Sequence, residues 1–210
     1  MMSKRALLLI DLQVDFVEGG ALAVPNGSEV IEVANRLIPC FDLVIATLDF
    51  HPADHKSFAS QNHGVGVYGE FELEGLPQTA WPDHCIAGSH GAELVRGLEA
   101  EGIDHLIYKG TDRSIDSYSG FYDNGHRKGT GLAELLRAQE VREVVILGLA
   151  TDYCVLYTAL DSISEGFSTV VVTDGCRGVG LRPTDIPAAW ARMERAGVRL
   201  AKSDEFNRVS

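Results

Sequence analysis

The sequence predicts an α/β protein in three layers, with a mostly parallel six-stranded sheet and helices on both of its faces. Apolar runs of strand length recur along the chain, and they are continuous rather than alternating, as in strands buried on both faces. Helical patterns lie between these runs. Strands that alternate with helices need crossover connections, which produce a parallel sheet covered on both sides.

Six segments have the composition of buried strands. Five are strongly apolar, such as "RALLLI" and "REVVILG", and the sixth, "VRLAK", is weaker. The six predicted strands span residues 5–10, 42–48, 104–109, 142–148, 168–174 and 198–202.

Four segments carry apolar residues at helical spacing and are predicted as helices. Ser28 is a candidate N-cap for the first of them. Gly166 and Gly197 follow the last two, at the position where a left-handed residue commonly ends a helix. The predicted helices span residues 28–38, 131–139, 154–165 and 185–196.

One long segment, residues 49–90, interrupts this alternation. It is rich in turn residues and holds five of the seven histidines. A loop longer than about 15 residues in a compact domain is usually functional or disordered. Its aromatic residues and histidines argue against disorder, so we expect this excursion to be functional.

Composition limits the classes of function. A chain of 210 residues with 45% hydrophobic residues predicts a single domain, residues 1–210, with a substantial core. A net charge of -12 argues against a nucleic-acid partner, because no cationic surface is apparent to neutralise phosphates. No segment approaches the roughly 20 apolar residues of a membrane span, so no membrane partner is expected. The four cysteines form no CxxC pair, which favours reduced thiols in a cytoplasmic protein.

Three reactive side chains lie at or near the ends of three predicted strands. Asp11 follows the first strand, Lys109 ends the third, and Cys154 opens the helix after the fourth. In a parallel sheet these ends lie at one edge, where ligands bind. Each residue alone has an ordinary structural explanation, but together they suit a thiol nucleophile, a base and a cation. A helix N-terminus and a nearby cation are expected to lower the pKa of the thiol.

A second group of residues suits a metal ion. Asp49 directly follows the second strand, and His51 lies two residues further on, so both side chains can face one ion in extended chain. His84 would return from the far end of the excursion. Two imidazoles and a carboxylate suit one divalent ion, Zn, Fe or Mn, with open positions left for water or substrate. His55 and His63 are further candidates, and an ordinary solvated histidine-rich loop is the alternative.

The combination of motifs resembles a known family. The stretches "LLLIDLQVDF", "ATLDFHPADHKSFASQNH", "GLPQTAWPDHC", "YKGTDRSIDSYSGFYDNG" and "GLATDYCV" are similar to those of the nicotinamidases, also called pyrazinamidases. These belong to the isochorismatase-like cysteine hydrolases. The resemblance covers roughly residues 5–202, and it implies the isochorismatase-like hydrolase fold with residues 49–90 as a metal- and substrate-binding excursion.

The resemblance also implies roles for individual residues. Asp11, Lys109 and Cys154 take the catalytic positions, and the backbone N–H groups of Ala150 and Cys154 form an oxyanion hole after a cis peptide between Leu149 and Ala150. The remaining assignments fall into two sets: a metal set of Asp49, His51 and His84, with His55 outside it, and a pyridine-binding set of Phe16, Trp81 and Tyr118.

The activity implied is hydrolysis of nicotinamide to nicotinate and ammonia through a cysteine thioester, with pyrazinamide as a second substrate, in NAD salvage. Another cysteine amidase of the N-carbamoyl hydrolase type is the nearest rival, and a non-catalytic sensor of nicotinamide or metal is the rival from a different class. The aromatic and metal sets argue against the amidase, because a non-aromatic substrate needs neither. The only partner expected is the small-molecule substrate, and a homo-oligomer is left open.

Overall fold

The computed structural model describes residues 4–206, and its centre is a six-stranded sheet. Every pair of neighbouring strands in this sheet is parallel. The predicted parallel sheet is therefore confirmed. Across the sheet the strands are β5 (His105–Lys109), β2 (Val44–Asp49), β1 (Lys4–Ile10), β6 (Val141–Leu149), β7 (Ser168–Arg177) and β8 (Arg199–Ala201).

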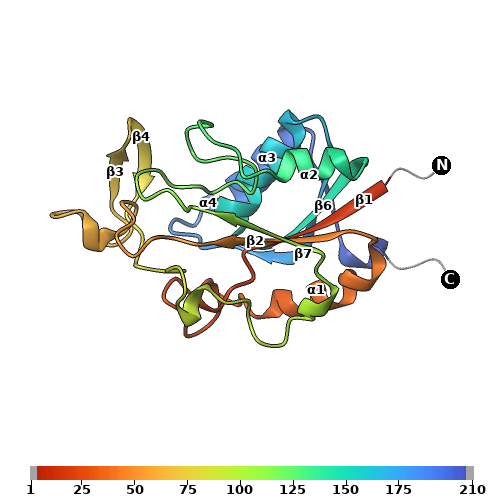
Figure 1. Cartoon of the computed structure of the whole chain (residues 1–210), viewed down its shortest axis with the longest axis horizontal. Coiled ribbons are helices and arrows are strands. Elements are labelled where there is room, and N and C mark those ends of the chain that lie inside the picture. The colour runs from red at the N-terminus through yellow and green to blue at the C-terminus, as the bar shows by residue number, and fades with distance from the viewer. Residues whose placement is uncertain (1–3, 207–210) are drawn as a thin grey trace.

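Helices cover both faces of the sheet, which gives the expected three layers (Figure 1). One face carries α1 (Glu29–Leu37), which packs mainly on β7. The other carries α2 (Leu132–Ala138), α3 (Leu156–Ser164) and α4 (Asp185–Arg195). Short 3-10 helices span Val14–Phe16, Ile38–Cys40, Ala59–Gln61, His90–Ala92, Ala100–Gly102 and Ser203–Phe206. None of the helices within residues 4–206 combines the length and the apolar character needed to cross a membrane.

The core explains why the strands are continuously apolar. Residues 6–10 of β1 and residues 144–147 of β6 are completely buried, because these central strands are covered by helices on both faces. Burying one such leucine, isoleucine or valine side chain contributes about 1.5–3 kcal/mol. The central strands are therefore rigid supports for the residues that follow them.

The helix ends were predicted with mixed success. Gly197 ends α4 at a φ of 95°, its N–H bonds the carbonyl of Glu194, and Val198 N–H bonds Met193, a Schellman motif. Gly166, at a φ of 86°, also follows its helix as expected. The Ser28 prediction is wrong in part. Ser28 occupies the N-cap position of α1 but has helical backbone angles and makes no side-chain capping bond.

Two elements were not predicted. Residues Thr151–Val155 form one turn of π-helix before α3, so Cys154 lies in this turn and α3 begins two residues later. Within the excursion, β3 (Glu70–Leu73) and β4 (Leu76–Thr79) form a hairpin that projects at one end of the molecule (Figure 1). Its two-residue turn, Glu74 and Gly75, has positive φ at both positions, which is the geometry of a type I′ turn.

Candidate active site

Neighbouring strand ends place three charged side chains at one point. Asp49 and Lys109 are paired in register at the ends of β2 and β5, and Asp11 follows β1 on the other side of β2. All three residues are at most 4% exposed. Their convergence, which the sequence predicted for Asp11 and Lys109, follows from the parallel order of the strands.

The Lys109 ammonium is the centre of this group. It lies 2.9 Å from Asp11 Oδ2, and it donates hydrogen bonds to Asp49 Oδ1 at 2.5 Å and to the carbonyl of Ser117 at 3.0 Å. It also donates to Cys154 Sγ at 3.4 Å. The three residues of the predicted catalytic set are thus in one cluster, and Asp49 joins it from the predicted metal set.

Burial and charge set the protonation of this cluster. Burial raises the pKa of Asp11 by more than the Lys109 ammonium lowers it, so Asp11 is a stronger base than an exposed carboxylate. Burial opposes the charge on Lys109, but the two carboxylates hold its pKa well above the ordinary value. Burial would also raise the pKa of Asp49, but Lys109 and His51 hold it well below the ordinary range.

The pKa of the Cys154 thiol differs from the expectation. Burial raises the pKa of Cys154 well above that of a free thiol, and the Lys109 cation only partly offsets this effect. The expected lowering of the Cys154 pKa was therefore wrong. Desolvation of the buried thiol outweighs one cation whose charge is shared with two carboxylates. A carboxylate oxygen of Asp11 lies within 4.8 Å of the sulfur, so a base that could accept the thiol proton is close to it.

The turn that holds Cys154 begins with an unusual backbone. The peptide bond between Leu149 and Ala150 is cis, as the resemblance implied. The N–H groups of Tyr153 and Val155 both bond the Ala150 carbonyl at 3.1 Å, which closes the π-turn. Asp152 in this turn accepts the N–H groups of Val179 and Gly180, and so joins it to the loop after β7.

The predicted metal residues also come together. The Nε2 atoms of His51 and His84 lie 3.5 and 3.6 Å from Asp49 Oδ2. Both Nδ1 atoms face backbone carbonyls, of Gly110 at 2.8 Å and Pro82 at 2.7 Å, and must donate to them. In the neutral imidazoles, the form that binds a metal, the lone pairs are therefore on Nε2. Burial lowers the pKa of His51, but the Asp49 carboxylate raises it above the ordinary value overall, so a bound metal ion would replace the Nε2 proton. Among the described residues, the Nε2 atom of His51 is buried without a hydrogen-bond partner. Histidines that ligate metals typically donate their other N–H in this way, so this donor set fits a metal ion.

Two neighbours fix the metal residues. Gly110 has a φ of 63°, and a Cβ there would lie 2.3 Å from the His51 ring, so only glycine fits. Gln13 accepts the Asp49 N–H at 2.8 Å and donates to the Asp49 carbonyl at 2.8 Å. The backbone of Asp49 is thereby held in place by the segment that follows β1.

His55 and His63 lie outside this group. His55 is buried beside His51, with ring centroids 4.3 Å apart. Its Nδ1 contacts the Ser57 hydroxyl at 2.8 Å and its Nε2 contacts the Ile115 carbonyl at 3.3 Å, so both nitrogens already have partners. His63 is exposed.

The three predicted aromatic residues line one cavity with Cys154 and His84. Phe16, Trp81 and Tyr118 form its apolar walls, and Ala150 is also part of them. The Tyr118 hydroxyl accepts hydrogen bonds from Trp81 Nε1 at 3.1 Å and Gln78 Nε2 at 3.0 Å. These aromatic walls beside the thiol are the kind of surface against which a flat ring packs.

Other lining residues were missed by the sequence analysis. Asp116, 3% exposed, lines the cavity, and a carboxylate oxygen lies within 4.8 Å of ligand atoms of His51 and His55. Gln78 donates to it at 2.8 Å. Tyr153 and Val179 also line the cavity. Only the adjacency of Tyr153 to Cys154 could have indicated one of these residues, because the others lie on loops.

Comparison with known proteins gives consistent matches. The sequence profile of the isochorismatase domain matches residues 5–205. The chain is 51% identical over 203 residues to a nicotinamidase of Escherichia coli, covering 95% of each chain. A solved nicotinamidase and pyrazinamidase of Acinetobacter baumanii has a TM-score of 0.95 and 38% identity, covering 98% of this chain and 99% of that one. A pyrazinamidase of Pyrococcus horikoshii in complex with zinc has a TM-score of 0.78 and 34% identity, covering 95% and 99%.

Proposed function

The chain belongs to the isochorismatase family, and from that premise we propose that it hydrolyses nicotinamide to nicotinate and ammonia. Pyrazinamide, which has a similar ring, is the second substrate, and NAD salvage is the physiological role. One observation carries the proposal: a thiol, a carboxylate and an ammonium group meet in a buried cluster beside a cavity with aromatic walls.

The first step of the reaction forms the nucleophile. The raised pKa of Asp11 suits it to accept the proton of the Cys154 thiol, and the Lys109 ammonium stabilises the resulting thiolate. The thiolate attacks the amide carbon. The backbone N–H groups of Ala150 and Cys154 stabilise the negative oxygen that develops, an effect typically worth about 2.7–4 kcal/mol of barrier.

The remaining steps return the enzyme to its starting state. Ammonia leaves after taking the proton from Asp11, which leaves a thioester on Cys154. Asp11 then accepts a proton from a water molecule that attacks the thioester, and nicotinate is released as the proton returns to the sulfur. Phe16, Trp81 and Tyr118 hold the ring during both steps and exclude other water molecules.

The proposed metal site uses Asp49, His51 and His84. These residues would hold a Zn, Fe or Mn ion, which would supply a Lewis acid for the ring nitrogen of the substrate. Two observations support this assignment: the Nε2 atoms of both histidines face Asp49 Oδ2, and that of His51 is buried without a hydrogen-bond partner among the described residues. His55 supports His51 by packing against it and is not a ligand in this proposal.

Ammonia release tests the proposed function directly. The wild-type protein, loaded with zinc or manganese, is expected to release ammonia from nicotinamide, and the Cys154→Ala variant is not. Asparagine is a control amide, because it has no ring to fill the aromatic cavity. Equal rates with both amides, or no release from nicotinamide, contradict the proposal.

A further inference from the structure

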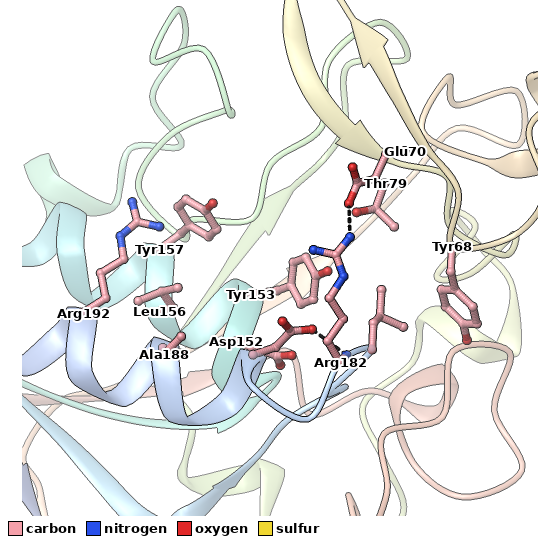
Figure 2. Close-up of a pocket in the computed structure, with 13 residues that line it drawn as sticks. Tyr68, Glu70, Thr79, Asp152, Tyr153, Leu156, Tyr157, Arg182, Ala188 and Arg192 are labelled. Carbon is pink, nitrogen blue, oxygen red and sulfur yellow. Dashed lines mark hydrogen bonds and ion pairs between the residues drawn. The ribbon is translucent and has the colours of Figure 1, made fainter.

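A second, larger cavity adjoins the cavity that contains Cys154. It has a volume of about 520 Å³, which is in the range of small-molecule sites, and we call it the outer cavity. Its walls come from the excursion, the π-turn, α3, α4 and the loop after β7. They include Tyr68, Thr79, Tyr153, Tyr157 and Arg182 (Figure 2).

The inner cavity, beside Cys154, is too small for a substrate. Its free volume is about 20 Å³, which is room for about one water molecule. A pyridine ring enters only if a wall moves. Most of the lining side chains are buried, and the partly exposed ones are those of Tyr118, Tyr153 and Val179.

Tyr153 differs from the other two. The Tyr118 hydroxyl is held by hydrogen bonds from Trp81 and Gln78, and Val179 is held by the bond from its N–H to Asp152. Among the described residues, the Tyr153 side chain has ring contacts, and Thr79, at the rim of the outer cavity, is the polar neighbour that partly offsets the rise in the pKa of Tyr153 caused by burial. Of the residues that line the inner cavity, Tyr153 is also the one that lines the outer cavity.

The ring contacts place Tyr153 as a wall between the two spaces. Its ring lies edge-on to Trp81, with centroids 4.7 Å apart, and 5.3 Å from the Tyr118 ring. Both partners belong to the inner cavity, while Tyr153 also lines the outer cavity, where Figure 2 shows its ring among the other lining side chains. Removing this ring would therefore join a cavity of about 20 Å³ to one of about 520 Å³.

Arg182 does not close the outer cavity firmly. Its guanidinium pairs with Glu70 at 2.7 Å across the cavity, from the loop after β7 to β3 (Figure 2). Both side chains are at least 70% exposed, and such surface pairs contribute little to stability. The outer cavity is thus open to solvent exchange, and the barrier to the thiol is further in.

We propose that the outer cavity is the entrance to the active site and that Tyr153 is the specificity-determining wall between the two. This inference rests on the proposed function. Tyr153 admits an unsubstituted pyridine or pyrazine carboxamide by a movement of its own ring. It rejects amides with a further bulky ring substituent, because that substituent has no room beside Trp81 and Tyr118 while the Tyr153 ring is in place.

Substrate selectivity of Tyr153 variants tests this proposal. The substrates are nicotinamide and nicotinamides that carry a phenyl group at ring position 5 or 6. Tyr153→Ala and the milder Tyr153→Leu are expected to raise kcat/KM for a phenyl amide, relative to nicotinamide, by at least about tenfold. Tyr153→Phe keeps the ring and is expected to leave this ratio unchanged. Tyr157→Ala is the matched control, because Tyr157 lines the outer cavity but not the inner one.

The outcomes separate this inference from the proposed function. A wild-type protein that releases no ammonia from nicotinamide contradicts the proposed function. In that case calorimetry tests the proposed role of Tyr153. Binding of a phenyl amide to Tyr153→Leu, but not to the wild type, supports the role. An unchanged ratio and unchanged binding in folded Tyr153→Ala or Tyr153→Leu overturns the inference. An equal rise in the kcat/KM ratio of phenyl amide to nicotinamide in Tyr157→Ala also overturns the inference.

Discussion

The two halves of the site are built differently. Asp11 and the turn with Cys154 follow β1 and β6, neighbouring central strands that are buried on both faces, and Lys109 ends the edge strand β5. The walls and much of the metal group come from the excursion and from loops, held by hydrogen bonds between side chains and backbone. The strand-end half is suited to covalent chemistry, and the loop half to holding and orienting a ring.

Removal of the nucleophile should have the largest effect. It should lower the rate of the chemical steps and leave substrate binding unchanged. We expect Cys154→Ala to lower kcat on the order of 10⁵-fold or more while nicotinamide binding, measured by calorimetry, is retained. The ring contacts and metal residues remain in this variant. Cys176→Ala is the control, since this buried cysteine lies in β7 outside the cavity, and its rate should stay near wild type. Ammonia release by Cys154→Ala well above background would show that another group is the nucleophile.

Removal of the buried cation should affect stability as well as rate. Lys109→Met leaves Asp11 and Asp49 buried without their cation, so we expect unfolding to become easier by about 3–5 kcal/mol in thermal or denaturant melts. The double variant with Asp11→Asn should recover part of this loss, because one uncompensated charge is gone. Additive losses in the double variant would mean that the two side chains do not interact as the 2.9 Å distance indicates.

Loss of the metal should weaken orientation rather than the thiol chemistry. We expect a chelator, His51→Ala or His84→Ala to lower the rate with nicotinamide roughly 10²-fold, because a misplacement of about 1 Å has that effect. Metal content per chain should fall in both variants and remain unchanged in the exposed His63→Ala control. Benzamide, which has no ring nitrogen, should be a poor substrate that loses far less on chelation. Equal losses for both amides would assign the ion a structural role or a role in activating water.

The same division decides how much could be predicted from the sequence. The strands, their parallel order and the convergence of Asp11 and Lys109 follow from apolar runs that end in charged residues, a local signal. The π-turn at Thr151–Val155 and the hairpin of β3 and β4 have no such signal, because tertiary contacts decide them. Asp116, in a loop, and Gln78, in β4, look like ordinary polar residues in the sequence, and only their burial identifies them. The pKa of Cys154 was mispredicted for a related reason, since sequence shows the nearby cation but not the desolvation.

The smallest expected effect concerns Thr47, a buried residue of β2 that changes the pKa of the proposed base, Asp11. Its hydroxyl donates to Asp11 Oδ1 at 2.6 Å, and this bond lowers the pKa of Asp11. Thr47→Val keeps the shape of the side chain and removes the bond, so the pKa of Asp11 should rise further. Asp11 accepts a proton only when it is ionised, so activity is present above its pKa and is lost as the pH falls through it. The acid limb of kcat/KM should therefore move to higher pH, by up to about one unit, since such a bond contributes about 0.5–1.5 kcal/mol. Thr158→Val is the matched control: Thr158 is also buried and accepts the Gly120 N–H, but it does not contact Asp11. Its acid limb should stay in place, and an equal shift in both variants would mean that the limb reports stability rather than the ionisation of Asp11.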